Sequence, residues 1–90
     1  MMRTITTKYY EHFKTKNIYL FLFFAKHSET QEELVVYQSM KTGKVWARPR
    51  AMFFGYSKDH DAEYRRFNPE SDAVGDAFRK KYEEFWELDQ

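Results

Sequence analysis

The stretch IYLFLFFA, residues 18–25, decides the fold of this chain. It is the longest apolar run, and its aromatic and branched residues over eight positions favour a strand buried on both faces over a helix. A helix that spans a bilayer needs roughly 18 apolar residues or more, so the run does not predict a membrane span. We therefore expect residues 18–25 to form the centre of a β-sheet.

Further strands are predicted on both sides of this run. From Tyr9 the residue types alternate with a period of two, which suits a strand. Branched residues recur around Val35 and after Gly43, and the tolerance of glycine for positive φ suits a hairpin turn between these segments. The segment after Pro49 is aromatic and apolar and is expected as an edge strand, followed by a charged loop over 57–66. The predicted strands are 9–14, 18–25, 34–40, 45–48 and 51–56.

One amphipathic helix is predicted at the C-terminal end. Asn68 and Pro69 make a suitable start, with Ser71 or Asp72 as the alternative cap. Apolar residues then recur at helical spacing, and we expect this face to pack on the chain's own sheet. Exposure of Phe85 or Trp86 would instead indicate a homodimer or a protein partner. The predicted apolar face is Val74, Phe78, Tyr82 and Phe85, widened by Ala77 and Trp86.

Length and composition predict a single domain over residues 1–90. Aromatic residues make up 20% of the chain, which supplies enough ring area for one core. Residues 1–8 are expected to be loosely ordered, 9–67 to be β-rich and 68–88 to hold the helix. The predicted fold class is α+β: a small antiparallel, partly open β-barrel or roll of four to five short strands, with one C-terminal amphipathic helix.

Charge and cysteine content limit the classes of function. Lys and Arg outnumber Asp and Glu by only 15 to 14, so no global field draws the chain to nucleic acid or to an anionic membrane, although a local basic patch is compatible with this balance. The absence of cysteine excludes disulfides and thiolate ligands and fits a reducing compartment. Polar residues follow Arg3 where a secretory signal would be apolar, so the cytoplasm is the expected location.

Several ordered blocks stand out in the sequence: YEHFK (10–14), AKHSET (25–30), EELVVY (32–37), WARP (46–49) and MF (52–53). Together they resemble an uncharacterised bacterial family, domain of unknown function 1653. The resemblance runs from Tyr9 to about Phe67, and it implies a small β domain without an established activity. Thr15 and Lys16 stand where the family tends to have a glycine turn, and Phe23 stands where a glycine is common.

A basic and aromatic hairpin is the first candidate binding surface. Trp46 and Arg48, with Lys41, Lys44 and Arg50 nearby, combine an aromatic face with positive charge, which is the pairing that stacks bases and neutralises phosphates. The alternative is a core Trp46 with ordinary solvated cations. A further hypothesis is that Arg48 forms a planar ion pair across the sheet with Glu29, Glu32 or Glu33. The predicted ligand-binding residues are Tyr10, His12, His27, Glu29, Trp46 and Arg48.

The polar run His27, Ser28, Glu29 and Thr30 is the candidate for catalysis, with His27 or His12 as the general base. Side chains adjacent in sequence usually diverge, so turn stabilisation is the competing interpretation. His12, His27 and His60, with Asp59 to Glu63, lack the regular spacings of zinc or calcium sites, and no cofactor fingerprint is present. We expect neither a metal nor a cofactor.

The sequence thus favours a non-catalytic binding or adaptor module, with nucleic acid as a candidate ligand. One alternative is a protein-interaction or homodimerisation domain that uses Phe85 and Trp86 of the C-terminal helix. Another is a small enzyme built on the 27–29 loop. The sequence leaves open whether the chain is a monomer or a homodimer, and it names no specific ligand.

Overall fold

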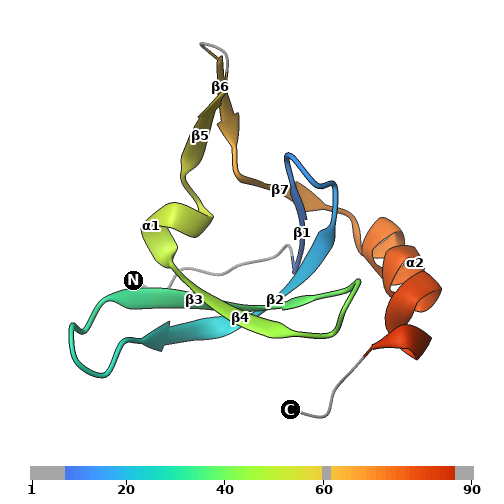
Figure 1. The fold of residues 1–90 in the computed structure, drawn as a ribbon, viewed down its shortest axis with the longest axis horizontal. Helices are drawn as coiled ribbons and strands as arrows, with labels where there is room; N and C mark the ends of the chain where they lie inside the picture. Colours follow the sequence, from blue (N-terminus) through green and yellow to red (C-terminus); the bar gives the residue numbers. More distant parts are fainter. Residues whose placement is uncertain (1–7, 60–61, 87–90) are drawn as a thin grey trace.

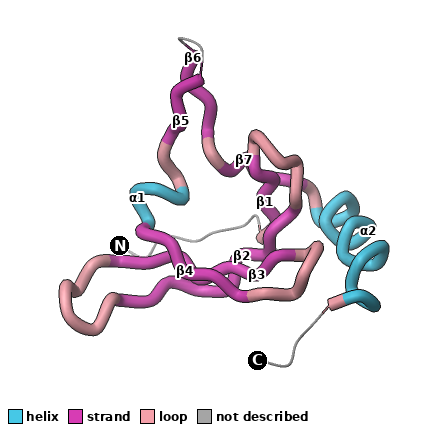
Figure 2. Tube along the Cα trace, viewed as in Figure 1, coloured by secondary structure: helices cyan, strands magenta, loops and turns pink. Residues whose placement is uncertain are grey.

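A computed structural model describes residues 8–59 and 62–86 of the chain (Figure 1). Five strands form one antiparallel sheet in the order β4-β3-β2-β1-β7. This sheet carries a helix after β7, so the fold is α+β as predicted (Figure 2). The sheet is open, because β4 and β7 are edges, and the expected barrel fits only loosely. The strands are β1 (Tyr9–His12), β2 (Ile18–Lys26), β3 (Glu33–Ser39), β4 (Val45–Pro49) and β7 (Phe67–Glu70).

The run that begins at Ile18 forms the central strand β2, with β1 on one side and β3 on the other. Its register against β3 shifts between Phe21 and Phe23, so a bulge interrupts the alternation of faces. Phe23 therefore shares a face with Val36, its partner in the register, and is 56% exposed. The expectation of burial along the whole run is thus wrong at Phe23.

Each face of the sheet holds its own core. On the first face, rings from β1, β3 and β7 meet Phe53, and Phe53 stacks on Phe67 with 4.2 Å between ring centroids. On the second face the C-terminal segment covers β1 and β2. The first core is Tyr10, Val35, Tyr37, Phe53 and Phe67, and the second is Tyr9, Ile18 and Met40, with Leu20, Phe78 and Trp86 packed against it.

The segment between β4 and β7 differs from the prediction. A short helix α1 (Arg50–Phe53) replaces the edge strand expected over 51–56, because one helical turn brings Phe53 and Phe54 into the first core. A hairpin of β5 (Tyr56–Asp59) and β6 (Ala62–Arg65) replaces the predicted loop and projects from the sheet (Figure 1). Main-chain pairing needs no apolar side chains, so the charged composition does not reveal this hairpin.

The C-terminal helix α2 (Asp72–Tyr82) begins later than Asn68. The hydroxyl of Ser71, the alternative cap, accepts a hydrogen bond from the Val74 main-chain N–H at 3.2 Å. Asn68 and Pro69 belong instead to β7, where they pair with Glu11 and Tyr10 of β1. A 3-10 turn η1 (Glu83–Phe85) follows α2 and ends the predicted helix before residue 88.

The face of α2 that meets the sheet is rotated from the predicted one. Val74 is 48% exposed and Phe85 69%, whereas Gly75 is buried. A Cβ on Gly75 would lie 2.2 Å from the Tyr9 ring, so only glycine lets the helix backbone come this close. The Tyr9 hydroxyl donates to the Asp76 carboxylate at 2.5 Å. Close approach at Gly75, rather than the width of the apolar stripe, therefore sets the rotation of α2.

Both prolines of the sheet lie on its edges. Ser39 N–H donates to the Lys44 carbonyl at 2.9 Å. In an antiparallel pair only every second residue is hydrogen-bonded to the neighbouring strand, so on β4 these residues are Trp46 and Arg48, and Pro49 is not among them. Phe13 N–H donates to the Arg66 carbonyl at 3.0 Å, and the same alternation excludes Pro69 on β7. Each proline ring nitrogen therefore points away from the sheet, where no ladder donor is needed.

Replacing Gly75 with alanine should destabilise the protein by about 1–3 kcal/mol, because the added methyl group overlaps the Tyr9 ring. Urea unfolding measures this free energy. The control is Ala77→Gly at an exposed position of the same helix, which should destabilise the protein by only about 1 kcal/mol through helix propensity. A Gly75→Ala variant more stable than the wild type would contradict the close approach.

Replacing Lys16 with glycine should raise the free energy of unfolding by about 0.5–1 kcal/mol, because Lys16 has φ 62° in the left-handed region that disfavours a Cβ. Gly43→Ala, at φ 81°, should change stability in the opposite direction. Equal stability of wild type and Lys16→Gly in urea would show that the turn is unstrained.

Candidate functional site

Arg48 is the centre of the candidate site, on the first face of the sheet. Its guanidinium carbon lies 5.5 Å from the centroid of the Phe67 ring, and its Nε donates to the Tyr37 hydroxyl at 3.3 Å. No carboxylate among the side chains that the structure describes forms an ion pair with Arg48. A half-buried cation held by rings and a neutral hydroxyl keeps its charge available to an anionic ligand.

Trp46 supplies an exposed ring next to this cation. It lies opposite Tyr37 in the register and two residues before Arg48, which places both side chains on the same face of β4. Its exposed fraction is 51%, so the alternative of a core tryptophan is wrong. We call Trp46, Arg48, Tyr37 and His12 the Trp46–Arg48 face.

His12 borders the same face from β1. Its ring packs edge-on against Phe67 at 5.0 Å between centroids, and its Nδ1 accepts a hydrogen bond from the Lys14 main-chain N–H at 3.2 Å. Burial lowers the pKa of His12, and the positive charges of Arg48, Arg66 and Lys14 lower it further. The neutral ring therefore carries its proton on Nε2, as a donor, in a region of positive potential.

The other predicted ligand-binding residues lie elsewhere. Tyr10 is in the core, 4% exposed, with its ring edge-on to Phe53 and Phe54. His27 and Glu29 are exposed in the turn between β2 and β3, where His27 Nδ1 accepts main-chain hydrogen bonds from Glu29 at 3.2 Å and Thr30 at 3.3 Å. This is the turn-stabilising interpretation of the polar run, and it separates these residues from the Trp46–Arg48 face.

The two predicted partner-binding residues have different surroundings. Trp86 packs on the second core, and its Nε1 donates to the Met40 carbonyl at 3.0 Å. Phe85 is not part of that core, and its 69% exposure is the highest among the large apolar side chains described. Of the pair, only Phe85 offers a free surface.

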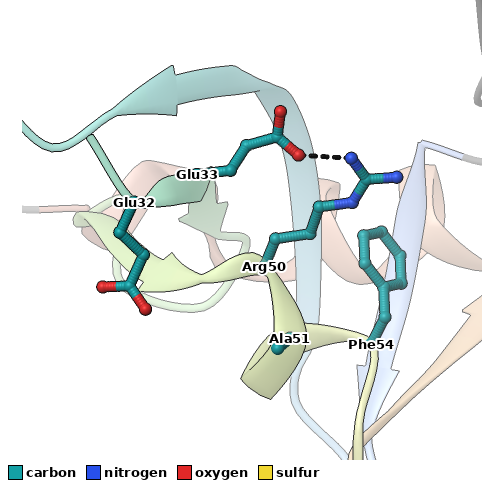
Figure 3. A pocket seen from close by; sticks show the side chains of 5 residues that line it. All are labelled: Glu32, Glu33, Arg50, Ala51 and Phe54. Carbon is teal, nitrogen blue, oxygen red and sulfur yellow. Dashed lines mark hydrogen bonds and ion pairs between the residues drawn. The ribbon is translucent and has the colours of Figure 1, made fainter. Parts of the chain in front are cut away.

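A hollow, which the sequence analysis missed, lies between the β2–β3 turn and α1 (Figure 3). It has a volume of about 510 Å³ and is lined by Glu32, Glu33, Arg50, Ala51 and Phe54. Arg50 forms an ion pair with Glu33, and its guanidinium lies 4.8 Å from the Phe24 ring centroid. The ion pair hypothesised for Arg48 thus forms at Arg50, which follows Pro49, the register partner of Leu34. This pairing neutralises Arg50 and makes the hollow a weaker anion site.

Two kinds of feature would point to a metal or a membrane in the described part of the chain: a cluster of metal-ligating side chains and a helix that could span a membrane. Among the side chains that the structure describes, which leave out those of residues 56–65, no group of three or more His, Cys, Asp or Glu gathers. Nor does that part of the chain contain a helix that is long and apolar enough to cross a membrane. His60 and Asp61 of the acidic run, and residues 1–7, lie outside the described residues.

Comparison with known proteins gives a family and no activity. A family model described as "Protein of unknown function (DUF1653)" matches residues 8–69, the segment from β1 almost to the end of β7. No curated protein and no solved structure matches the chain. The matched segment holds every residue of the Trp46–Arg48 face and stops before α2.

The lowered pKa of His12 predicts that the protein loses stability in acid. The folded state disfavours the imidazolium, so this contribution is complete above the unfolded-state pKa near 6.5 and disappears as the pH falls through the folded-state pKa. Urea unfolding between pH 7.5 and pH 5 measures the decrease. His12→Gln should flatten part of this dependence, and His27→Gln is the control for removal of an imidazole. Identical pH profiles for wild type and His12→Gln would refute the role of His12.

Proposed function

Because the chain belongs to the DUF1653 family, whose description assigns no activity, we propose its function from the surface itself: a non-catalytic module that binds single-stranded nucleic acid on the Trp46–Arg48 face. The observation that carries this proposal is the pairing of an exposed Trp46 with a cation that no described carboxylate neutralises. Bases present aromatic faces to the ring, and the backbone presents phosphates to Arg48.

The magnitudes favour a weak, salt-sensitive interaction. Stacking of one base on an aromatic side chain contributes about 1–3 kcal/mol, and phosphate contacts release counterions. The formal net charge is only +1, so attraction comes from the local group of Arg48, Arg66 and Lys14 rather than from the whole molecule. Single strands suit this surface, because an exposed ring on an edge strand can stack on an unstacked base, whereas the bases of a duplex are already stacked on one another.

Catalysis is the less favoured proposal. His27 Nδ1 is engaged by two main-chain donors in an exposed turn, and His12 lies on a different strand. An enzyme would need these groups to converge in a pocket with a third residue that orients the base. A protein partner at Phe85 is favoured by its exposure alone.

Trp46→Ala should weaken binding of an octathymidylate at low salt by about tenfold, because the base has no ring on which to stack. Arg48→Gln should also weaken binding, because the variant cannot neutralise a phosphate. Amide shifts of labelled protein report both affinity and location. Phe23→Ala is the matched control, since Phe23 is an exposed ring on the opposite face. Binding that is indifferent to salt and to both substitutions would rule out this face.

A further inference from the structure

A basic hollow lies where β3 turns into β4, outside the Trp46–Arg48 face. It has a volume of about 260 Å³ and is lined by Lys41, Thr42, Lys44 and Phe85. Two of these residues are cations, one carries a hydroxyl, and none is acidic. Lys41 and Lys44 form no ion pair with a carboxylate among the described side chains, and Lys41 Nζ lies 5.8 Å from the centroid of the Tyr82 ring.

The main chain of this turn is already fixed by hydrogen bonds. Ser39 Oγ accepts from the N–H groups of Lys41 and Thr42 at 3.2 and 3.1 Å, and Gln38 Nε2 donates to the Gly43 carbonyl at 2.9 Å. Thr42 Oγ1 accepts from Lys44 N–H at 3.3 Å, which leaves its own O–H free to donate to a ligand. The lysines therefore start from a preorganised turn, so the entropic cost of ordering the main chain is small when an anion binds.

Phe85 forms the remaining wall of the hollow from η1. Trp86, its neighbour, is anchored on the Met40 carbonyl, immediately before Lys41 in the chain. This anchor holds η1 against the turn while the Phe85 ring stays 69% exposed. An exposed ring beside two lysines that no described carboxylate neutralises repeats the chemistry of Trp46 and Arg48.

The hollow and the Trp46–Arg48 face lie along one strand. Lys44 directly precedes β4, and its carbonyl accepts a hydrogen bond from Ser39 N–H, so the hollow lies at the N-terminal end of this strand. Residues two apart in a strand are about 7 Å apart, so about 14 Å separates Lys44 from Arg48. One phosphate cannot contact both positions, whereas an extended polyanion can.

We propose that the hollow of Lys41, Thr42, Lys44 and Phe85 is a second subsite for the same single-stranded nucleic acid, which runs along β4 with a phosphate on the lysines and a base on Phe85. This inference rests on the proposed function of the Trp46–Arg48 face. It predicts that the ligand runs along β4 and that the ligand must be long enough to reach both subsites. It also assigns a role to α2 and η1, which lie outside the segment matched by the family model.

The experiment compares two probes by amide shift titration at low and moderate salt. A thymidine dinucleotide has one phosphate and can fill one subsite, whereas an octathymidylate can reach both. We expect the octamer to bind at least about fivefold more tightly and to shift the amides of residues 41–44 as well as those of Trp46 and Arg48. Lys41→Gln with Lys44→Gln should abolish the length preference and lower the salt slope by about 0.7 for each phosphate that the lysines no longer neutralise.

Phe85→Ala tests the stacking wall, and Val74→Ala is its matched control, because both residues are exposed apolar side chains of the C-terminal segment. We expect only Phe85→Ala to reduce octamer affinity, with thermal stability unchanged in both variants. Lys80→Gln, at an exposed position of α2, controls for the removal of a lysine charge.

Four results would overturn the inference, and they separate it from the proposed function. Equal affinity for both probes, with shifts confined to Trp46 and Arg48, would refute the second subsite and leave the first. Octamer binding that ignores Trp46→Ala and Arg48→Gln would refute the proposed function and the continuous path. Competition by millimolar inorganic phosphate at residues 41–44 would reduce the hollow to a simple anion site. Equal competition by hexaglutamate would identify an acidic protein segment as the ligand.

Discussion

The stack of Phe53 on Phe67 holds this small fold together across its open side. The sheet has no hydrogen bonds between its edges β4 and β7, yet α1 follows β4 directly and carries Phe53 to the ring on β7, with centroids 4.2 Å apart and planes within 6°. Arg48 adds a second link, because its guanidinium on β4 lies over the same Phe67 ring. Side-chain contacts thus join the two edges of this sheet, whereas main-chain hydrogen bonds join the edges in a closed barrel.

This link explains why the candidate site lies where it does. The Phe67 ring meets Phe53, Tyr37, His12 and the Arg48 guanidinium, so one buried side chain touches both the core and the proposed ligand surface. A guanidinium over aromatic rings is oriented without a carboxylate, which preserves its charge for a ligand. Arg50 shows the contrast, since its ion-pair partner Glu33 neutralises it.

The central strands and their hairpin could be predicted because local signals agree there. The apolar run at residues 18–25 is long enough for a central strand, and Gly43 marks the turn that sets the register of Trp46 and Arg48. The sequence pattern also groups Trp46 with Arg48, because residues two apart on a strand share a face. His27 and Glu29 do not join this group, because they belong to the β2–β3 turn, where main-chain N–H groups occupy His27 Nδ1.

The errors arise where long-range contacts decide the structure. Aromatic content after Pro49 suits a strand, but packing of Phe53 on Phe67 selects a helical turn. Asn68 and Pro69 match a helix start, but pairing with β1 extends them as β7. Gly75 sets the face of α2 that meets the sheet, because the Tyr9 ring packs where a side chain would otherwise stand. A pattern of apolar residues does not reveal this contact, because glycine adds no apolar side chain to the pattern.

The placement of Pro49 and Pro69 has a consequence for the behaviour of the protein in concentrated solution. An open sheet offers two unsatisfied margins on which further chains could add, and such growth leads to fibrils. Each margin here contains one residue without an amide hydrogen, pointing outward. An incoming strand would leave an acceptor unpaired at each proline, so every added copy would repeat the same defect. The two prolines therefore oppose the addition of further strands to the open sheet, while Trp46 and Arg48 on β4 stay available to a ligand.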